Sequence, residues 1–490
     1  MSKLKTARII TQLAVFLFIA AAFFLLSYPF KFVNARDFFL SSPSLVAFAA
    51  LSAQYVIPAF LIVLIFVIAA LLLGRVFCGW VCPYGAVMDF FAFIAKPFRK
   101  WKESSPSKIL MSKYVLLLLF LVLAVLGFQF VWIFEPITVF SRFYNLTFYP
   151  FINAAVDKIF QYAITNHNLG EGIYYFLRDN IFDARQSSFA YSLAFFVLFM
   201  TPVLLALYKR RFWCRYVCPL GASLGVLSVK PVFKLNLQKC KASCGKCENM
   251  CRTNAIKHDG TYIPSECVMC MDCVDLQCRQ REDLKVKSED KGVTRKQFLF
   301  WGGGVLAALY MAGRKTYAAG HKSIAPVIRP PGAISEREFK QACVRCGNCM
   351  KVCVTNGLQP IMTESGIDGI WTPKMDNYIG YCEYNCNACG HVCPTQAIEA
   401  LSMEEKMKRS IGRAEIIKDI CIPWRDGISC LVCEEHCPVP DKAIKFVPEI
   451  INGKNVDVPV IDLELCIGCG VCQNKCPVEG RNRGIMVRPL

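Results

Sequence analysis

Histidine is scarce in this sequence, and the common haem and nucleotide motifs are missing. Only five of the 490 residues are histidines, and none lies within a long apolar run. The apolar runs therefore offer no histidine pair for a b-type haem, and no C-x-x-C-H motif marks attachment of a c-type haem. The sequence also lacks G-x-x-x-x-G-K-[ST] and G-x-G-x-x-G, which argues against a nucleotide or flavin site.

Acidic residues are also in deficit. The chain has 37 Asp and Glu against 56 Lys and Arg, a formal net charge of +19. Such an excess could indicate nucleic-acid binding, but the basic residues gather beside apolar runs, in "YKRR" and "KPFRKWK". Cytoplasmic membrane loops have this composition, and 54% hydrophobic residues is high for a soluble protein. We therefore expect a membrane protein with no nucleic-acid partner.

Four apolar runs are long enough to cross a bilayer, which takes about 20 residues. They are Ile9–Phe30, Phe38–Gly74, Tyr114–Phe134 and Gln186–Tyr208. The second is too long for one span and contains Pro43 and Pro58, so we place its helix near Tyr55–Gly74. A removed signal peptide is the alternative for the first run, although no clear cleavage site follows it.

Lysine and arginine placement predicts the orientation of these spans. Basic residues precede the first span, seven lie between positions 75 and 113, and three follow the fourth span at positions 209–211. These segments should be cytoplasmic, and the segment 135–185 should be outside. A fifth run, Gln297–Gly313, follows "TRKQFLF", which is similar to a twin-arginine export signal with Arg295-Lys296 at its centre. It would carry the remaining chain outside; a buried helix is the alternative.

Of the 28 cysteines, 24 fall into quartets with a spacing close to the ferredoxin pattern C-x2-C-x2-C-x3-C-P, in which three thiolates hold one [4Fe–4S] cluster and the fourth reaches a second. Two quartets lie mid-chain: Cys240, Cys244, Cys247, Cys251 and Cys267, Cys270, Cys273, Cys278. The two mid-chain quartets depart slightly in one gap each and lack the proline. Exchange of fourth ligands would join Cys278 to the first three cysteines and Cys251 to the second three. A disulfide scaffold is excluded by chain length and spacing.

Four more quartets follow. They are Cys343, Cys346, Cys349, Cys353; Cys382, Cys386, Cys389, Cys393; Cys421, Cys430, Cys433, Cys437; and Cys466, Cys469, Cys472, Cys476. Adjacent quartets exchanging fourth ligands is the simplest arrangement, and an outer-with-inner arrangement stays open. Zinc also takes four thiolates, but zinc ribbons use C-x2-C pairs, so six [4Fe–4S] clusters fit better.

Four cysteines remain, and they belong to a repeat. "RVFCGWVCPYGA" contains Cys78 and Cys82, and "RFWCRYVCPLGA" contains Cys214 and Cys218. On a helix, positions i and i+4 share a face, so two such faces could present four thiolates. The repeats could build one further metal site at the cytoplasmic membrane surface. A redox-active dithiol pair and a docking surface for the cluster domain are the alternatives.

These motifs resemble two known families. Four spans, two C-x3-C-P repeats and a ferredoxin segment are similar to the NapH-type membrane ferredoxin over roughly residues 1–285. The stretch from Arg295, with its x8 gap between Cys421 and Cys430, resembles the NapG-type ferredoxin. The chain looks like a fusion of these two quinol dehydrogenase components of the periplasmic nitrate reductase system. The resemblance implies quinol oxidation, with electrons passed to a periplasmic reductase or a cytochrome c.

The fold expected is an α-helical membrane domain with α+β ferredoxin-like iron–sulfur domains. Residues 1–230 would form the four-span domain, 231–285 a two-cluster segment, 286–320 a linker with the fifth run, and 321–490 a four-cluster domain. The chain would lie in a bacterial inner membrane as a multi-pass protein, with its four-cluster domain in the periplasm. Its substrate would be the membrane quinol pool.

Other functions remain open. The chain could be an assembly, maturation or regulatory factor, since C-x3-C-P membrane ferredoxins also resemble such proteins. It could also pass electrons from a cytoplasmic reductant to quinone. No motif marks a quinol pocket; His167 in the outer segment is a candidate proton acceptor, with a solvated histidine as the alternative. His391 and His436 lie between cluster cysteines and could tune a potential, but each quartet is complete without them.

Overall fold

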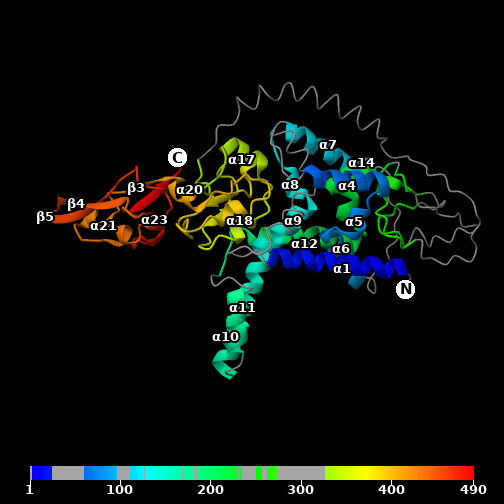
Figure 1. Ribbon diagram of the computed structural model, residues 1–490, viewed down its shortest axis with the longest axis horizontal. Helices are drawn as coiled ribbons and strands as arrows, with labels where there is room; N and C mark the ends of the chain where they lie inside the picture. Colours follow the sequence, from blue (N-terminus) through cyan, green and yellow to red (C-terminus); the bar gives the residue numbers. More distant parts are fainter. Residues whose placement is uncertain are drawn as a thin grey trace, which may run out of the picture. The chain divides into compact units, whose positions relative to one another are not determined.

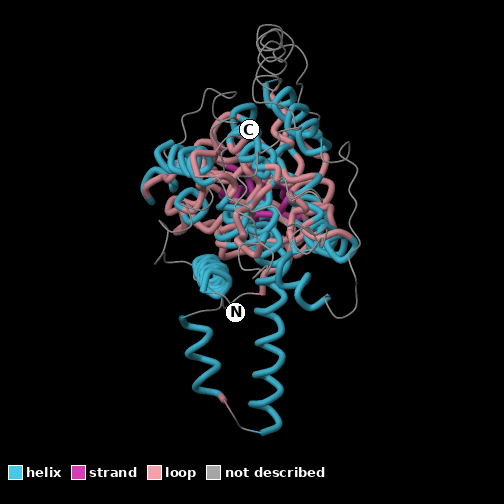
Figure 2. The backbone as a smooth tube through the Cα atoms, turned by 90° about the vertical axis from the view of Figure 1, so that its right-hand side faces the viewer, coloured by secondary structure: helices cyan, strands magenta, loops and turns pink. Residues whose placement is uncertain are grey.

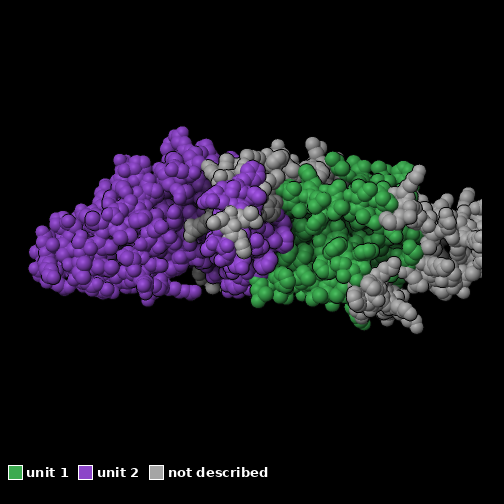
Figure 3. All heavy atoms as spheres, turned by 90° about the horizontal axis from the view of Figure 1, so that it is seen from below, with its two compact units in different colours: residues 1–24, 34–143, 193–321 green, residues 25–33, 144–192, 322–490 purple. Residues whose placement is uncertain are grey.

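A computed structural model describes residues 3–24, 60–95, 111–125, 127–167, 170–180, 186–229, 231–233, 250–256, 262–273 and 326–490. The chain divides into two compact units, which Figure 3 shows in different colours. Unit 1 comprises residues 1–24, 34–143 and 193–321, and unit 2 comprises 25–33, 144–192 and 322–490. Residues 144–192, which the sequence division assigned to the membrane domain, thus group with the cysteine-rich C-terminal part.

The long elements of the described part of unit 1 are helices, and loops and turns make up most of residues 250–256 and 262–273 (Figures 1 and 2). The elements of unit 1 are α1 (Lys3–Phe24), α4 (Phe60–Leu73), α5 (Val76–Trp80), α6 (Pro83–Ala95), α7 (Ser112–Val125), α8 (Val131–Phe134), α9 (Pro136–Phe143), α12 (Ser192–Tyr208), α13 (Phe212–Tyr216), α14 (Pro219–Leu227) and the short 3-10 helix η4 (Pro264–Glu266).

The sequence repeat is also a structural repeat. In each copy a long apolar helix, α4 or α12, leads into a five-residue helix, α5 or α13, and then into a helix that begins at proline, α6 or α14. Proline suits the first helical position because its missing N–H would have no partner there and its φ is already helical.

The expected spans differ from the observed helices. Among the described residues, one helix, Leu4–Phe23, is long and apolar enough to cross a membrane; it fits an anchor or a signal. The third predicted span is not continuous, because α7 ends at Val125 and the chain turns at Gly127, whose φ is +91°. At 1.5 Å per residue α7 is about 21 Å long and α12 about 26 Å. Four full-length spans are therefore not supported.

Unit 2 combines short helices with small sheets. Its elements are the π-helix η3 (Tyr144–Phe148), α10 (Tyr149–His167), α11 (Glu171–Asn180), α17 (Glu336–Ala342), α18 (Asn348–Lys351), β1 (Leu358–Pro360), the 3-10 helix η5 (Ile367–Gly369), β2 (Pro373–Met375), α19 (Ala388–His391), α20 (Met403–Lys408), β3 (Arg413–Ile416), α21 (Ile422–Asp426), α22 (Val432–Glu435), β4 (Ile444–Ile451), β5 (Lys454–Ile461), α23 (Val471–Lys475) and β6 (Ile485–Arg488).

The strands of unit 2 form three two-stranded antiparallel sheets, β1–β2, β3–β6 and β4–β5. The hairpin β4–β5 turns through Asn452 and Gly453, both with positive φ, as a two-residue hairpin turn requires. These sheets are too small to enclose a large apolar core. In the described part of the unit, the cysteines instead surround separate cavities.

Candidate metal centres

The second cysteine of each repeat caps the helix that follows it. Cys218 is the N-cap of α14, and its sulfur accepts a hydrogen bond of 3.1 Å from the backbone N–H of Gly221. The Cys82 sulfur accepts the equivalent bond from Gly85. The C-P-x-G pattern is thereby explained, since proline starts the helix and the glycine N–H faces the sulfur.

The two repeats bring their four cysteines together at one buried site. Cys78, Cys82, Cys214 and Cys218 are each at most 7% exposed. Burial, followed by repulsion from neighbouring thiols of the same set, raises the pKa of Cys82 and of Cys218 well above the ordinary value. The expectation that each pair occupies one helix is wrong. The chain leaves α5 after Trp80, so the pair spans a helix break.

An arginine from each repeat holds the other repeat. Arg75 donates to the carbonyl of Cys214 at 3.2 Å, and Arg211 donates to the carbonyl of Cys78 at 2.9 Å. Both guanidinium groups are fully buried. A Cβ at Gly221 would lie 2.6 Å from Arg75 Nη2, so the repeat's glycine leaves room for this exchange. The four-cysteine site is therefore built by long-range contacts between the two copies.

The ferredoxin segment, described at residues 250–256 and 262–273, packs against both repeats, and a Cβ at Gly225 of the second would lie 3.0 Å from the carbonyl oxygen of Ser265. A Cβ at Gly79 would lie 2.1 Å from the carbonyl oxygen of Val268, so only glycine fits this contact. The Trp80 ring N–H donates to the carbonyl of Met269 at 2.8 Å. The second repeat has Arg215 at the position equivalent to Gly79. The close contact with Val268 is therefore made by Gly79 of the first repeat.

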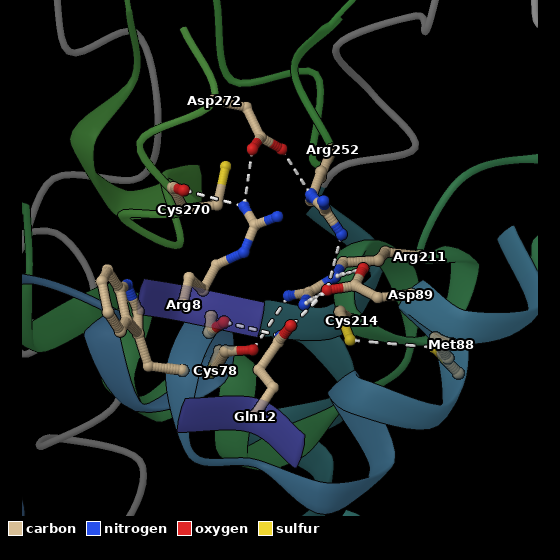
Figure 4. A network of polar contacts seen from close by, with 12 residues as sticks. Arg8, Gln12, Cys78, Met88, Asp89, Arg211, Cys214, Arg252, Cys270 and Asp272 are labelled. Carbon is tan, nitrogen blue, oxygen red and sulfur yellow. Dashed lines mark hydrogen bonds and ion pairs between the residues drawn. The ribbon is translucent and has the colours of Figure 1, made fainter. Parts of the chain in front are cut away.

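A chain of buried and partly buried charges joins the same elements (Figure 4). Arg8 of α1 pairs with Asp272 at 2.7 Å, Arg252 bridges Asp272 and Asp89, and Arg211 pairs with Asp89 at 2.6 Å. Burial alone would raise the pKa of Asp89, but Arg211 and Arg252 hold it below its ordinary value. These pairs tie the ferredoxin segment to α1, α6 and the second repeat.

The structure describes the positions of part of the mid-chain cysteine set. Cys251, Cys267 and Cys270 are close enough that their charges interact, and burial followed by contact with Cys251 and Cys270 raises the pKa of Cys267 to about 12. This proximity is what fourth-ligand exchange requires. The other predicted set lies outside the described residues; it consists of Cys240, Cys244, Cys247 and Cys278.

Unit 2 contains four cavities, each lined by four cysteines and holding about 330 to 380 Å³ of empty space. The sets are Cys343, Cys346, Cys349 with Cys393; Cys382, Cys386, Cys389 with Cys353; Cys421, Cys430, Cys433 with Cys476; and Cys466, Cys469, Cys472 with Cys437. Every cavity takes three cysteines from one quartet and the fourth from its neighbour. The structure thus has the adjacent arrangement and not the outer-with-inner one.

These cavities suit a cluster better than a single ion. Among the described residues, no three His, Cys, Asp or Glu side chains converge on one metal-ion position. A zinc site needs all its sulfurs about 2.3 Å from one point. Four thiols spread around a cavity match the donor set of a [4Fe–4S] cluster, whose iron charge would offset the repulsion between thiolates.

The two middle cavities of unit 2 are directly linked. The backbone N–H of Cys382 donates to the carbonyl of Cys469 at 2.8 Å, joining one ligand-lined wall to the next. Asn377 donates to Gln473 at 3.3 Å across the same boundary. The four cavities therefore have a defined order: the Cys343, Cys382, Cys466 and Cys421 sets.

The segment 144–192 packs against the first of these cavities. Asn145 of η3 donates to the carbonyl of Cys346 at 3.2 Å and to the side chain of Asn348 at 2.7 Å. The ammonium of Lys351 lies 4.0 Å from the centre of the Tyr149 ring. Asn356 donates to the carbonyl of Ser188 at 2.8 Å. The segment thus forms a packing surface for the cysteine-rich domain.

Sequence reasoning missed Glu135. This carboxylate is fully buried, and burial raises its pKa to about 7 even though backbone and side-chain bonds from Thr138 oppose the shift. Its Oε2 caps α9 by accepting the N–H of Thr138 at 2.7 Å, while Oε1 has no partner among the described residues. The ring of Phe134 stacks at 6.1 Å on Trp213, the residue before Cys214. A glutamate before proline resembles an ordinary helix start, so no sequence pattern distinguished it.

The histidines are peripheral where they are described. His167 is the last residue of α10, and its side chain lies outside the described part. His391 and His436 are exposed, and a ring nitrogen of His436 shares a hydrogen bond with the carbonyl of Val432 at 2.9 Å. None of this tests their predicted roles.

Family comparisons agree with the cysteine pattern. The 4Fe-4S binding domain family matches residues 55–102 and again 191–238, the two repeats. A 4Fe-4S dicluster domain matches residues 426–479, and the NosR family matches residues 238–291. The prediction of a ferredoxin-type iron–sulfur protein is confirmed. No solved structure matches the chain.

Curated proteins of similar sequence include two ferredoxin-type proteins and a regulatory protein. The methylamine utilization ferredoxin-type protein MauM of Methylorubrum extorquens is 30% identical over 196 residues, 39% of this chain and 87% of that protein. The ferredoxin-type protein NapG of Escherichia coli is 34% identical over 33% of this chain and 71% of that protein. The regulatory protein NosR of Pseudomonas aeruginosa is 30% identical over 44% of this chain but only 26% of its own length.

Proposed function

This chain belongs to the family of ferredoxin-type proteins that includes MauM and NapG, and from that premise we propose that it is a membrane-bound quinol dehydrogenase component. It oxidises quinol and passes the electrons through cysteine-held [4Fe–4S] clusters to a reductase or cytochrome c outside the cytoplasmic membrane. The observation that carries the proposal is the ordered series of four-cysteine cavities in unit 2, which has the form of an electron relay.

The cysteines have proposed roles as ligands. Each cavity of unit 2 holds one cluster, the mid-chain segment holds two, and the four-cysteine site of the repeats holds a seventh. A match of the 4Fe-4S binding domain family to both repeats supports this last assignment over a dithiol pair. A bound [4Fe–4S] cluster accepts and donates one electron at a time, and hydrogen bonds to its sulfurs tune its potential.

The membrane placement is also part of the proposal. Helices α1, α4, α7 and α12 make up a multi-pass domain in the bacterial inner membrane, with both C-x3-C-P motifs on the cytoplasmic side. The segment 144–192 lies between α7 and α12 and faces outward. Because this segment seats the cysteine-rich domain, as the contact of Asn145 with Cys346 illustrates, the four-cluster domain lies outside with it.

Quinol oxidation releases two electrons and two protons, so the protein needs a proton acceptor and successive one-electron carriers. Glu135 is the acceptor that the geometry supports, because its Oε1 has no hydrogen-bond partner in the described structure and its pKa is close to neutral. Phe134 precedes this carboxylate in the chain, and its ring stacks on Trp213, the residue before Cys214. His167 stays an alternative acceptor. The quinone leaves, and the two electrons enter the clusters singly.

The test is reduction of anaerobically purified protein by a quinol analogue, followed by EPR. We expect the clusters to be reduced, and protein with its clusters filled yet still oxidised after quinol addition would contradict the proposal. A second function, in regulation or assembly of another respiratory enzyme, is favoured by the similarity to NosR, which is a regulatory protein by name. Loss of the chain would then leave a cofactor unassembled instead of starving an intact reductase of electrons.

A further inference from the structure

Lys406 is a buried cation at the junction between the two pairs of cavities in unit 2. It belongs to α20 and is 2% exposed. Its ammonium donates to the carbonyl of Tyr384 at 2.7 Å and also to the carbonyl of Glu383. Glu383 and Tyr384 directly follow Cys382 in the chain, so the charge is anchored beside the wall of the second cavity.

No carboxylate balances this charge within the described structure, because Lys406 takes part in no ion pair there. Lys340, another buried lysine of this domain, differs in that it pairs with Asp368 at 3.4 Å. A buried cation with no opposite charge beside it generally lowers the stability of a fold by several kcal/mol. The fold of unit 2 keeps one at this position, which calls for a negative partner other than a side-chain carboxylate.

The surroundings supply that partner. The ammonium lies beside the second cavity, because Glu383, whose carbonyl it binds, lines that cavity together with Cys382 and Cys386. The hydrogen bond from Cys382 to Cys469 holds the wall of this cavity to the wall of the next. A [4Fe–4S] cluster with four thiolate ligands is anionic, so two negative groups would flank one lysine.

We propose that Lys406 is a charge shared by the two middle clusters that raises both of their reduction potentials. An added electron makes a cluster more negative, and a nearby cation in a buried setting favours that reduced form. Raised reduction potentials of the two middle clusters would allow single electrons to pass from one pair of clusters to the other. The inference rests on the proposed function, because it requires clusters in both cavities.

The experiment compares neutral variants, Lys406→Met and Lys406→Gln, with Lys406→Arg, which keeps the charge. Lys408→Met is the matched control, since Lys408 is on the same helix and its side chain is 75% exposed. Redox-titrated EPR of the full chain, with iron and sulfide counted for each preparation, gives the potentials. Variants Cys389→Ser and Cys472→Ser identify the signals of the two middle clusters.

In a neutral variant we expect both middle clusters to shift to lower potential together. At fixed potential the reduced-to-oxidised ratio should fall about tenfold, which is about 59 mV for a one-electron couple. The other clusters, Lys406→Arg and Lys408→Met should keep wild-type potentials. Unchanged potentials in a fully loaded neutral variant would overturn the inference, as would a shift in only one cluster.

The iron and sulfide content of each preparation distinguishes the remaining outcomes. If neither neutral variant binds its clusters while Lys406→Arg does, the lysine serves assembly, and its role in setting potentials is wrong. If wild-type protein itself lacks iron in unit 2, the proposed function fails independently of Lys406.

Discussion

Replacement of Gly79 by alanine should dislodge the ferredoxin segment from the first repeat. The new Cβ would lie 2.1 Å from the carbonyl oxygen of Val268 and 3.2 Å from its carbonyl carbon, whereas real Cβ contacts essentially never fall below 3.0 Å. Both atoms are backbone, so no side chain can rotate away. The segment would have to move by roughly 1 Å or detach, given that overpacked sites relax only by shifting backbone.

The expected loss of stability follows from the contacts involved. Overpacking of this kind costs about 1–3 kcal/mol. Detachment would forfeit the neutral bond from Trp80 to Met269, worth about 1 kcal/mol, and the charged bond from Arg8, worth about 1.5–3 kcal/mol. Alanine would return about 0.5–1 kcal/mol through its better helix propensity. We therefore expect detachment of the segment to destabilise the protein by about 1.5–3.5 kcal/mol.

The assay is thermal unfolding of anaerobic, cluster-loaded protein together with EPR of the mid-chain clusters. Gly172→Ala is the matched control, because Gly172 is helical and nothing lies within 4 Å of the Cβ it would gain. Gly79→Ala should melt earlier and lose the signal of the cluster assigned to Cys251, Cys267, Cys270 and Cys273. If Gly79→Ala behaves as Gly172→Ala does, then Gly79 has no part in seating the ferredoxin segment.

Three other outcomes test the remaining assignments. Cys78→Ser and Cys214→Ser should each lower the iron content by about four per chain, since a [4Fe–4S] cluster has four ligands; unchanged iron would favour a dithiol pair. The rate of cluster reduction by a quinol analogue should rise as pH increases through about 7, because only ionised Glu135 can accept a proton, and Glu135→Gln should flatten this profile. If His167→Gln flattens it instead, the histidine is the acceptor. Cys430→Ser should stop electron delivery to an external acceptor while quinol still reduces the other clusters, a combination visible by EPR and acceptor assay.

Much of the candidate site follows from local sequence. Three cysteines within a few residues can surround only one cluster, so the spacing around Cys343, Cys346 and Cys349 identified a cavity wall that the structure contains. The proline and glycine of the two repeats likewise act within one turn, where they start a helix and expose an N–H to a sulfur. Such features depend on neighbours in the chain and need no knowledge of the fold.

Apolar composition was a weaker guide. The stretch from Tyr114 to Phe134 carries no charge, and hydropathy predicted one span, but the chain turns at Gly127 and continues in short helices. Hydropathy records where side chains prefer to lie and carries no information on backbone direction. Burial of Glu135 was missed for the same reason, because the elements that cover it are set by that turn.

The sequence by itself determined which three neighbouring cysteines line each of the four cavities described in unit 2. Only the tertiary structure decided that Cys393 and Cys353 change places between adjacent cavities, that Arg75 and Arg211 hold opposite repeats, and that the ferredoxin segment seats on Gly79. The physical reason is range. A spacing of two or three residues restricts where neighbouring thiols can lie, whereas contacts between distant residues depend on how whole elements pack.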